Sequence, residues 1–299
     1  MCTEKRLELA HKEEKVFGLT AAMPSGTGLS PLIEQFPERF WDVAIAEQHA
    51  VTSMGPLAKE GFKPFCTIYS TFLQRGYDQV IHDICLMDLP VVFALDRAGI
   101  VGEDGETHQG VFDISFLRAI PNMTLFAPRN ENDMHAAMDF AHTFPTPCSL
   151  RYPRGAFLDT TVEEAKPFEL GKSQLLQEST KDILFIGYGN GVGRAMQTAE
   201  LMDEEVAILD LRFVKPFDKD TLRTCADKYA HWYVFSDSAK MGGVGSALLE
   251  FLAEEGITNT NVKSFEYEDE FITHGNTKLV EESLGLLPEQ IAKRVSSLT

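Results

Sequence analysis

The fold is decided by residues 42–68, DVAIAEQHAVTSMGPLAKEGFKPFCTI. A short apolar run over 42–45 predicts a strand, and the pattern from 46 to 60 predicts a helix that Gly61 ends. A second apolar run over 63–68 predicts the next strand. Apolar strands that alternate with helices are typical of parallel sheets covered on both faces. The stretch therefore predicts an α/β fold with doubly wound, mostly parallel sheets.

The same alternation continues on both sides of this stretch and is interrupted once, where turn and charged residues dominate. We predict a first domain over 1–155, a linker over 156–180 and a second domain over 181–299. A length of 299 residues suits two domains that each bury a core. The predicted strands are 15–20, 42–45, 63–68, 90–96, 123–127, 148–152, 182–186, 206–211, 232–236 and 262–265. The predicted helices are 46–60, 72–87, 114–119, 131–143 and a tail from about 279.

Acidic residues dominate the charge of the chain. It has 45 Asp and Glu against 27 Lys and Arg, a formal net charge of −18. A surface of that sign repels phosphate backbones and anionic lipids, so we expect neither nucleic acid nor a membrane as partner. An anionic substrate would need a local group of arginines to bind against this field.

The N-terminus and the cysteines predict a cytoplasmic protein. Residues 1–6 are charged and lack the apolar stretch of a signal peptide, and no run approaches the ~18 apolar residues of a membrane helix. The five cysteines are odd in number and include no Cys-x-x-Cys pair. They predict free thiols buried as small apolar side chains.

Two glycine-rich runs in the second domain are either ligand sites or turns. Gly187–Gly193 follows a predicted strand and opens a helix, which is the pattern of a dinucleotide-binding turn. Asp210 has about the spacing of the acidic residue that such a site uses. Gly242–Gly245 is a similar run. Glycines also serve tight strand-to-helix turns without a ligand, and we favour that interpretation for both.

In the first domain, ionisable residues follow the predicted strands. Glu47 begins a helix, where it either complements the helix dipole or offers a ligand a carboxylate whose pKa is raised by apolar neighbours. Arg97 and Arg154 follow two further strands, each as a salt-bridge partner or as an anion-binding group. Because the carboxyl ends of parallel strands meet at one edge, we expect these residues to converge.

The stretch Tyr69–Arg75 also follows a predicted strand. Its polar groups and its aromatic ring could hold a planar or anionic ligand. In the alternative interpretation, Phe72 is a core residue and Arg75 lies on a helix surface.

The loop Gly99–Gly110 has four glycines in twelve residues, which lets the backbone approach a ligand closely. It presents Asp104 and His108. A loop histidine with a pKa near neutral can move protons or hydrogen-bond a substrate oxygen. Without a second His or Cys cluster nearby, a metal site is not expected.

Several of these stretches resemble the transketolase-like, thiamine-diphosphate-dependent enzymes. Residues 45–51, IAEQHAV, resemble the signature of their pyrimidine-binding domain. Residues 69–79, 96–102, 104–110 and 152–155 are similar to the branch that condenses pyruvate with glyceraldehyde 3-phosphate. The resemblance extends from residues 20–24 to 186–191, so it implies a pyrimidine-binding domain followed by a transketolase-type C-terminal domain.

This resemblance implies a role for each matched residue on the cofactor side. Glu47 would hydrogen-bond the aminopyrimidine ring of thiamine diphosphate and so promote loss of the thiazolium C2 proton. Phe72 would stack on the pyrimidine, and Ile45 would contribute to the apolar pocket around the carboxylate.

A second group of matched residues would line the substrate side. Arg97 and Arg154 would bind the phosphate of glyceraldehyde 3-phosphate, and His108 would also be catalytic. The full group is Tyr69, Arg75, Arg97, Asp104, His108 and Arg154.

The sequence departs from the family in one respect. The family's diphosphate-binding domain carries a Gly-Asp-Gly motif and a following Asn that hold Mg²⁺ and the diphosphate. The nearest string, Glu103-Asp104-Gly105, lies in the wrong domain and has no such Asn. We therefore expect a C-terminal fragment or a subunit that is inactive alone, with the missing domain and its Mg²⁺ ligands supplied in cis or in trans. The resemblance also implies a homodimer.

Two other functions stay open. The chain could be the smaller subunit of a split transketolase, which moves ketol units between sugar phosphates. It could instead be a non-catalytic assembly module. Residues 96–99 and 152–155 favour the pyruvate-condensing enzyme over the first alternative, and the presence of Glu47 and His108 in full motifs argues against the second.

Overall fold

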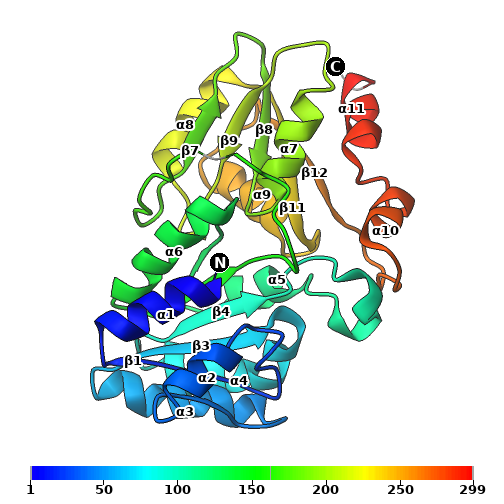
Figure 1. Ribbon diagram of the computed structural model, residues 1–299. Helices are drawn as coiled ribbons and strands as arrows, with labels where there is room; N and C mark the ends of the chain where they lie inside the picture. Colours follow the sequence, from blue (N-terminus) through cyan, green and yellow to red (C-terminus); the bar gives the residue numbers. More distant parts are fainter. Residues whose placement is uncertain (1, 162, 298–299) are drawn as a thin grey trace.

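A computed structural model describes residues 2–161 and 163–297 of the chain. Two α/β domains lie one above the other, the first at the bottom of Figure 1 and the second at the top. Each is built on a mostly parallel sheet, so the predicted fold class is confirmed.

The first sheet has seven strands in the order β10-β5-β6-β4-β3-β1-β2. All neighbours are parallel except β10, which pairs antiparallel with β5. The strands are β1 (Val16–Thr20), β2 (Phe40–Asp42), β3 (Lys63–Tyr69), β4 (Val92–Asp96), β5 (Thr124–Phe126), β6 (Cys148–Arg151) and β10 (Phe213–Lys215).

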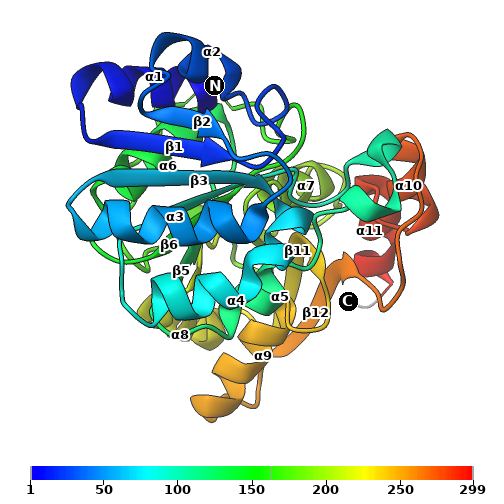
Figure 2. The same cartoon turned by 90° about the horizontal axis from the view of Figure 1, so that it is seen from below.

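Helices cover both faces of this sheet, and α3 lies along β3 on the face turned toward the viewer in Figure 2. Successive strand residues point to opposite faces, so Phe65 packs in the cluster of α1, α2 and α6, whereas Cys66 packs in that of α3. The covering helices are α1 (Cys2–Lys12), α2 (Ser30–Gln35), α3 (Glu47–Lys59), η1 (Ser70–Gly76), α4 (Tyr77–Gln79), η2 (Val80–Cys85) and α6 (Glu131–Thr143).

The second sheet has the order β12-β11-β8-β9-β7, with β7 antiparallel to β9. Its strands are β7 (Gln174–Gln177), β8 (Ile183–Gly187), β9 (Ala207–Asp210), β11 (His231–Ala239) and β12 (Asn261–Tyr267). One face packs against α7 (Gly191–Ala199) and α11 (Pro288–Ser296), the other against α8 (Lys219–Lys228) and α9 (Val244–Glu254).

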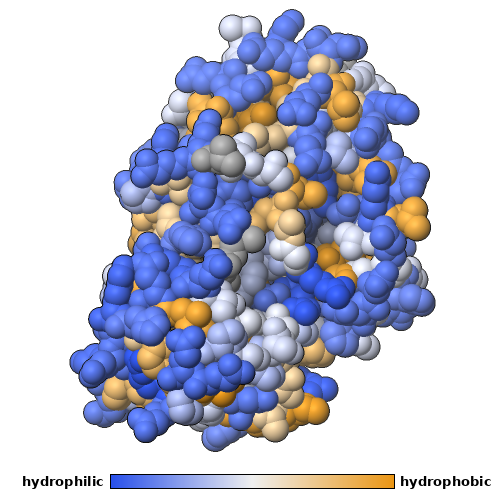
Figure 3. All heavy atoms as spheres, in the orientation of Figure 1, coloured by the Kyte–Doolittle hydropathy of each residue, from blue (hydrophilic) through white to orange (hydrophobic). Residues whose placement is uncertain are grey.

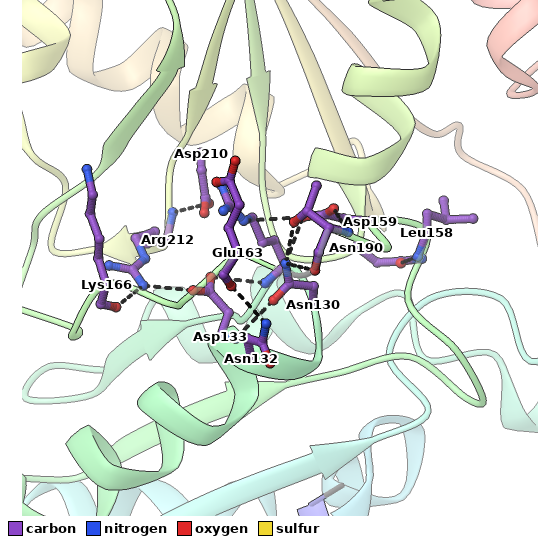
Figure 4. Close-up of polar contacts among 12 residues, drawn as sticks. Asn130, Asn132, Asp133, Leu158, Asp159, Glu163, Lys166, Asn190, Asp210 and Arg212 are labelled. Carbon is purple, nitrogen blue, oxygen red and sulfur yellow. Dashed lines mark hydrogen bonds and ion pairs between the residues drawn. The ribbon is translucent and has the colours of Figure 1, made fainter.

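A buried polar network joins the two domains (Figure 4). The Arg212 guanidinium donates to Asp133 Oδ1 of α6 at 3.0 Å and to the backbone carbonyls of Lys166 and Pro167. Asp210 lies beside this pair, where burial and the negative charge of Asp133 raise its pKa to about 7. Together with β10, which leaves the second domain to join the first sheet, this network fixes the domains against each other.

The structure differs from the predicted elements at several places, and it contains two helices that were not predicted, α1 and α2. The strand expected over 42–45 is β2, which ends at Asp42, because Ala44 has a φ of 61° and turns the chain. The helix expected over 72–87 consists of a 3-10 turn, one α-turn and a π-helix. Strand β7 lies within the segment predicted as a linker, and β10 comes from the predicted second domain although it completes the first sheet.

The described cysteines are buried and the surface shown in Figure 3 is largely polar, in line with the composition of the chain. Cys66, Cys85, Cys148 and Cys225 are buried and free, whereas the Cys2 side chain lies outside the described part. In the residues described, no helix has the length and apolar character to cross a membrane. Figure 3 shows a largely hydrophilic face with scattered hydrophobic groups.

Candidate active site

The predicted site residues gather at the carboxyl ends of β1, β3 and β4. After β1 the chain moves outward to β2 and then returns to β3 on the other side of β1. Where consecutive connections leave in opposite directions, an open parallel sheet has a crevice at its carboxyl edge, and ligands bind there. The last residues of these strands, Thr20, Tyr69 and Asp96, border that edge.

Glu47 is the first residue of α3, and its side chain is only 4% exposed. Its Oε2 lies 3.5 Å from Nη1 of Arg75, whose own side chain is 54% exposed. Among the described residues, no other group donates a hydrogen bond to this carboxylate or pairs with it. A buried carboxylate with free acceptor positions fits a ligand that presents an N–H group.

An aromatic stack lies next to this carboxylate. The rings of Tyr69 and Phe72 are stacked with centroids 5.9 Å apart, and the His108 ring meets Phe72 edge-on at 5.1 Å. The Arg97 guanidinium lies 3.8 Å from the centre of the Tyr69 ring, a cation–π contact. The Arg75 guanidinium lies 5.9 Å from the centre of the Phe72 ring, a longer contact of the same kind. A planar ligand ring could extend this stack.

Asp104 lies between two arginines at this edge. Its carboxylate is 3.5 Å from Nε of Arg97 and 3.3 Å from Nη1 of Arg154. The Arg97 Nη1 also donates to the Gly26 carbonyl at 2.9 Å, and the Arg154 Nη1 donates to the Val101 carbonyl at 2.8 Å. Two guanidinium groups thus share one carboxylate in this triad of Arg97, Asp104 and Arg154, and the Arg154 side chain, 42% exposed, stays accessible to an anion.

Residues that the sequence analysis missed complete the edge. Burial raises the pKa of Asp96 to about 6, although the adjacent Arg97, which donates to Asp96 Oδ1 at 3.1 Å, lowers it. Gly26 faces the Tyr69 hydroxyl so closely that a Cβ would come within 1.7 Å of it. The one sequence signal for this contact is the string Ser25-Gly26-Thr27-Gly28 after the first strand.

Ile45 and His49, which lie close to Glu47 in the sequence, take part in none of the contacts described above. Ile45 is 73% exposed in the turn before α3, so within this chain it does not provide the apolar surroundings that we expected around Glu47. His49, two residues after Glu47, is exposed on α3 and contacts Ser53 one turn later. The early end of β2 accounts for the position of Ile45, because the chain turns at Ala44 instead of continuing as a strand.

The protein's own atoms fill the two glycine-rich turns of the second domain. A Cβ at Gly193 would lie 2.3 Å from the backbone nitrogen of Asp159, so the segment after β6 occupies the start of α7. In the other turn, the buried Glu266 carboxylate accepts the backbone N–H of Val244 at 2.8 Å and that of Gly245 at 3.2 Å. A phosphate would need those positions, which supports the interpretation of both runs as turns.

Within residues 2–161 and 163–297, no group of three or more His, Cys, Asp or Glu side chains is arranged to hold a metal ion.

Comparison with known proteins identifies the family. The transketolase pyrimidine-binding domain matches residues 2–158, and the transketolase C-terminal domain matches residues 171–291. The chain therefore belongs to the transketolase family, as the resemblance of residues 45–51 predicted.

Two curated relatives with the same name match almost the whole of this chain. The 1-deoxy-D-xylulose-5-phosphate synthase of Sulfurimonas denitrificans is 72% identical over 99% of this chain and 49% of its own length. That of Nitratiruptor sp. is 65% identical, again over 99% of this chain and 48% of its own length. The chain spans about half the length of these relatives.

Solved structures share the fold. A split-gene transketolase, solved as an inactive β4 tetramer, superposes with a TM-score of 0.87 at 25% identity and covers 99% of this chain and 96% of that one. The Campylobacter jejuni transketolase has a TM-score of 0.78 at 19% identity, with 99% of this chain and 46% of that chain covered.

Proposed function

We propose that this chain supplies the pyrimidine-binding and C-terminal domains of a 1-deoxy-D-xylulose-5-phosphate synthase. This enzyme would decarboxylate pyruvate and join the remaining two-carbon unit to glyceraldehyde 3-phosphate, the first step of the non-mevalonate isoprenoid route. The observation that supports it most is that one sheet edge carries both the buried Glu47 carboxylate and the triad of Arg97, Asp104 and Arg154.

Thiamine diphosphate, when bound, supplies the electron sink for decarboxylation. On the chain's side, the Glu47 carboxylate would accept a hydrogen bond from the pyrimidine ring, for which its free acceptor positions are suited. Phe72 would orient that ring by stacking, since it already stacks with Tyr69.

The substrate side would bind the phosphate of glyceraldehyde 3-phosphate. Arg154, with a side chain 42% exposed, can turn from Asp104 toward an incoming anion, whereas Arg97 is 14% exposed and held by Gly26. His108 is positioned by its edge contact with Phe72 to hydrogen-bond a substrate oxygen or move a proton. Tyr69 and Arg75 would border the same space.

The remaining parts of the site would come from a diphosphate-binding domain in cis or in trans, which would hold Mg²⁺ and the diphosphate. Curated relatives about twice as long support this requirement. A homodimer would bring Ile45, 73% exposed here, against a second chain and so give it the apolar surroundings that it lacks.

Reconstitution tests this proposal. The 299-residue chain is combined with the half of the Sulfurimonas denitrificans relative that it does not match, and CO₂ release from pyruvate is measured with Mg²⁺ and thiamine diphosphate. We expect turnover that requires glyceraldehyde 3-phosphate, and none from the chain alone. Ketol transfer between sugar phosphates without pyruvate would instead support a split transketolase, and decarboxylation by the chain alone would contradict the dependence on a second domain.

A further inference from the structure

We propose that Gln109 is a positioning residue that connects the second domain to the phosphate-binding side of the site. Its side chain links the carbonyl of Thr273 to the backbone of Val101, and Val101 in turn holds Arg154. The second domain would thereby set the position of a substrate-binding group to which it contributes no side chain.

The loop Gly99–Gly110 is closed at its base. Gly99 and Gly110 exchange two backbone hydrogen bonds, of 2.7 and 2.8 Å, which form an isolated antiparallel bridge. Asp104 and His108 lie inside this loop. Any tilt of the closed loop would therefore move both side chains together.

The Gln109 side chain ties the loop internally and externally. It is buried, with 4% of its surface exposed. Its Oε1 accepts the Val101 N–H at 2.8 Å, across the loop, and its Nε2 donates to the Thr273 carbonyl of the second domain at 3.2 Å. Groups from two domains thus satisfy both ends of this buried amide. The two hydrogen bonds fix the orientation of the side chain, which an apolar side chain of similar volume could not do.

Val101 connects this amide to the substrate side. Its carbonyl accepts from Nη1 of Arg154 at 2.8 Å, and Arg154 lies 3.3 Å from Asp104. The connection therefore runs from Thr273 through Gln109 and Val101 to the arginine expected to bind phosphate.

The second domain also contacts the loop directly. A Cβ on Gly102 would lie 2.7 Å from Thr277 Oγ1 and 2.9 Å from the Gly275 carbonyl, so the two segments are in close contact. The Gly275 N–H donates to the Gly102 carbonyl at 3.3 Å. Figures 1 and 2 both show this loop, with η3 (Gly102–Asp104) and η4 (Glu106–His108), beside α10 (Thr277–Ser283).

Gln109→Met tests the connection, because methionine keeps the volume and removes both hydrogen bonds. Gln197→Met is a matched control, since Gln197 Nε2 also donates to a backbone carbonyl, that of Leu158, which is not part of the loop. The first readout is amide hydrogen exchange in the 299-residue chain. We expect exchange in the Gly99–Gly110 loop to rise roughly fivefold to tenfold in Q109M, the effect of about one hydrogen bond, and to stay unchanged in Q197M.

The second readout rests on the proposed function and uses the reconstituted enzyme. We expect Q109M to raise KM for glyceraldehyde 3-phosphate about tenfold, with KM for pyruvate and exchange of the cofactor C2 proton unchanged. Q109E, which keeps the acceptor for Val101 and loses the donor to Thr273, should fall between wild type and Q109M, and it also serves if Q109M fails to fold.

The two readouts separate the proposals. If wild type shows no turnover, the proposed function is contradicted, while loop exchange still decides the role of Gln109. Loop exchange in the Gln109 variants equal to that of wild type would overturn the inference. A uniform change in both KM values and kcat would also overturn it, since that is the response to a merely structural defect.

Discussion

The loop Gly99–Gly110 and the turn Gly242–Gly245 are both rich in glycine and both follow a strand, yet they differ in what lies in front of them. In the second domain, the Glu266 carboxylate fills the turn and takes its backbone N–H groups. In the first, the loop backbone bonds to its own ends and to the second domain, and Asp104 and Arg154 remain partly exposed. Glycine content indicates backbone freedom, whereas a ligand site also needs groups left free to bind.

The same contrast applies to charge. The Arg194 guanidinium of the second domain is 1% exposed and pairs with two carboxylates, those of Asp237 and Glu281. In the first domain, Arg97 and Arg154 share Asp104, and the pKa of the neighbouring Asp96 is raised to about 6. Arg97 likewise meets two carboxylates, but Arg154 is 42% exposed and meets Asp104 alone among the described residues, so one guanidinium at this sheet edge stays accessible to an anion.

Removing Arg154, the more exposed arginine of the triad, should have the largest effect on substrate binding. For Arg154→Ala in the reconstituted enzyme, we expect binding of glyceraldehyde 3-phosphate to weaken by ~2–4 kcal/mol, because a phosphate would lose a charged partner. Steady-state kinetics with varied glyceraldehyde 3-phosphate measures this. Arg223→Ala, which removes an exposed arginine of α8, is the control. An unchanged KM in Arg154→Ala would remove this residue from the substrate side.

Glu266 makes the filled turn sensitive to pH. Burial raises its folded-state pKa to about 7, against an ordinary value of 4.5, so the folded chain holds the proton more tightly than the unfolded chain. The resulting stabilisation is fully present below pH 4.5 and is lost as pH rises through 7. It amounts to at most ~3 kcal/mol.

Urea unfolding at pH 5 and pH 8 measures this effect in wild type and in Glu266→Gln. We expect the free energy of unfolding of wild type to fall more steeply with rising pH than that of the variant, which cannot ionise. Parallel pH profiles would show that the carboxyl in this turn does not change its protonation on folding.

A methyl group distinguishes a filled turn from an open one. At Gly193, a Cβ would meet the Asp159 backbone nitrogen at 2.3 Å, so Gly193→Ala should cost ~1–3 kcal/mol of stability through overpacking. At Gly256, at the end of α9, nothing lies within 4 Å of a Cβ, and Gly256→Ala should cost only the ~1 kcal/mol of its positive φ. Denaturant unfolding of both variants tests the order, which would be reversed if the Gly193 turn could open.

The sequence predicted most of the fold because buried parallel strands carry apolar residues on both faces, as Phe65 and Cys66 do. It missed β7 and β10, which have four and three residues, since the pairing of such short edge strands depends on tertiary contacts. The π-helix at Val80–Cys85 was missed because its apolar spacing resembles that of an α-helix.

For the site, the sequence predicted which polar residues follow strands, and parallel strands bring such residues to one edge. On that basis, Glu47, Arg97 and Arg154 could be proposed as candidates from the sequence. It could not reach the contact of Gly26 with Tyr69, which depends on how the loop after β1 folds back. Nor could it foresee the exposure of Ile45, which follows from one left-handed residue, Ala44.

The role of Glu47 is the centre of this account, and exchange of the C2 proton of thiamine diphosphate measures it most directly. In the reconstituted enzyme in D₂O, wild type should accelerate this exchange. Glu47→Ala and the isosteric Glu47→Gln should reduce it to the rate of the free cofactor while the chain stays folded. An undiminished rate in either variant, with the cofactor still bound, would contradict the assignment of this carboxylate.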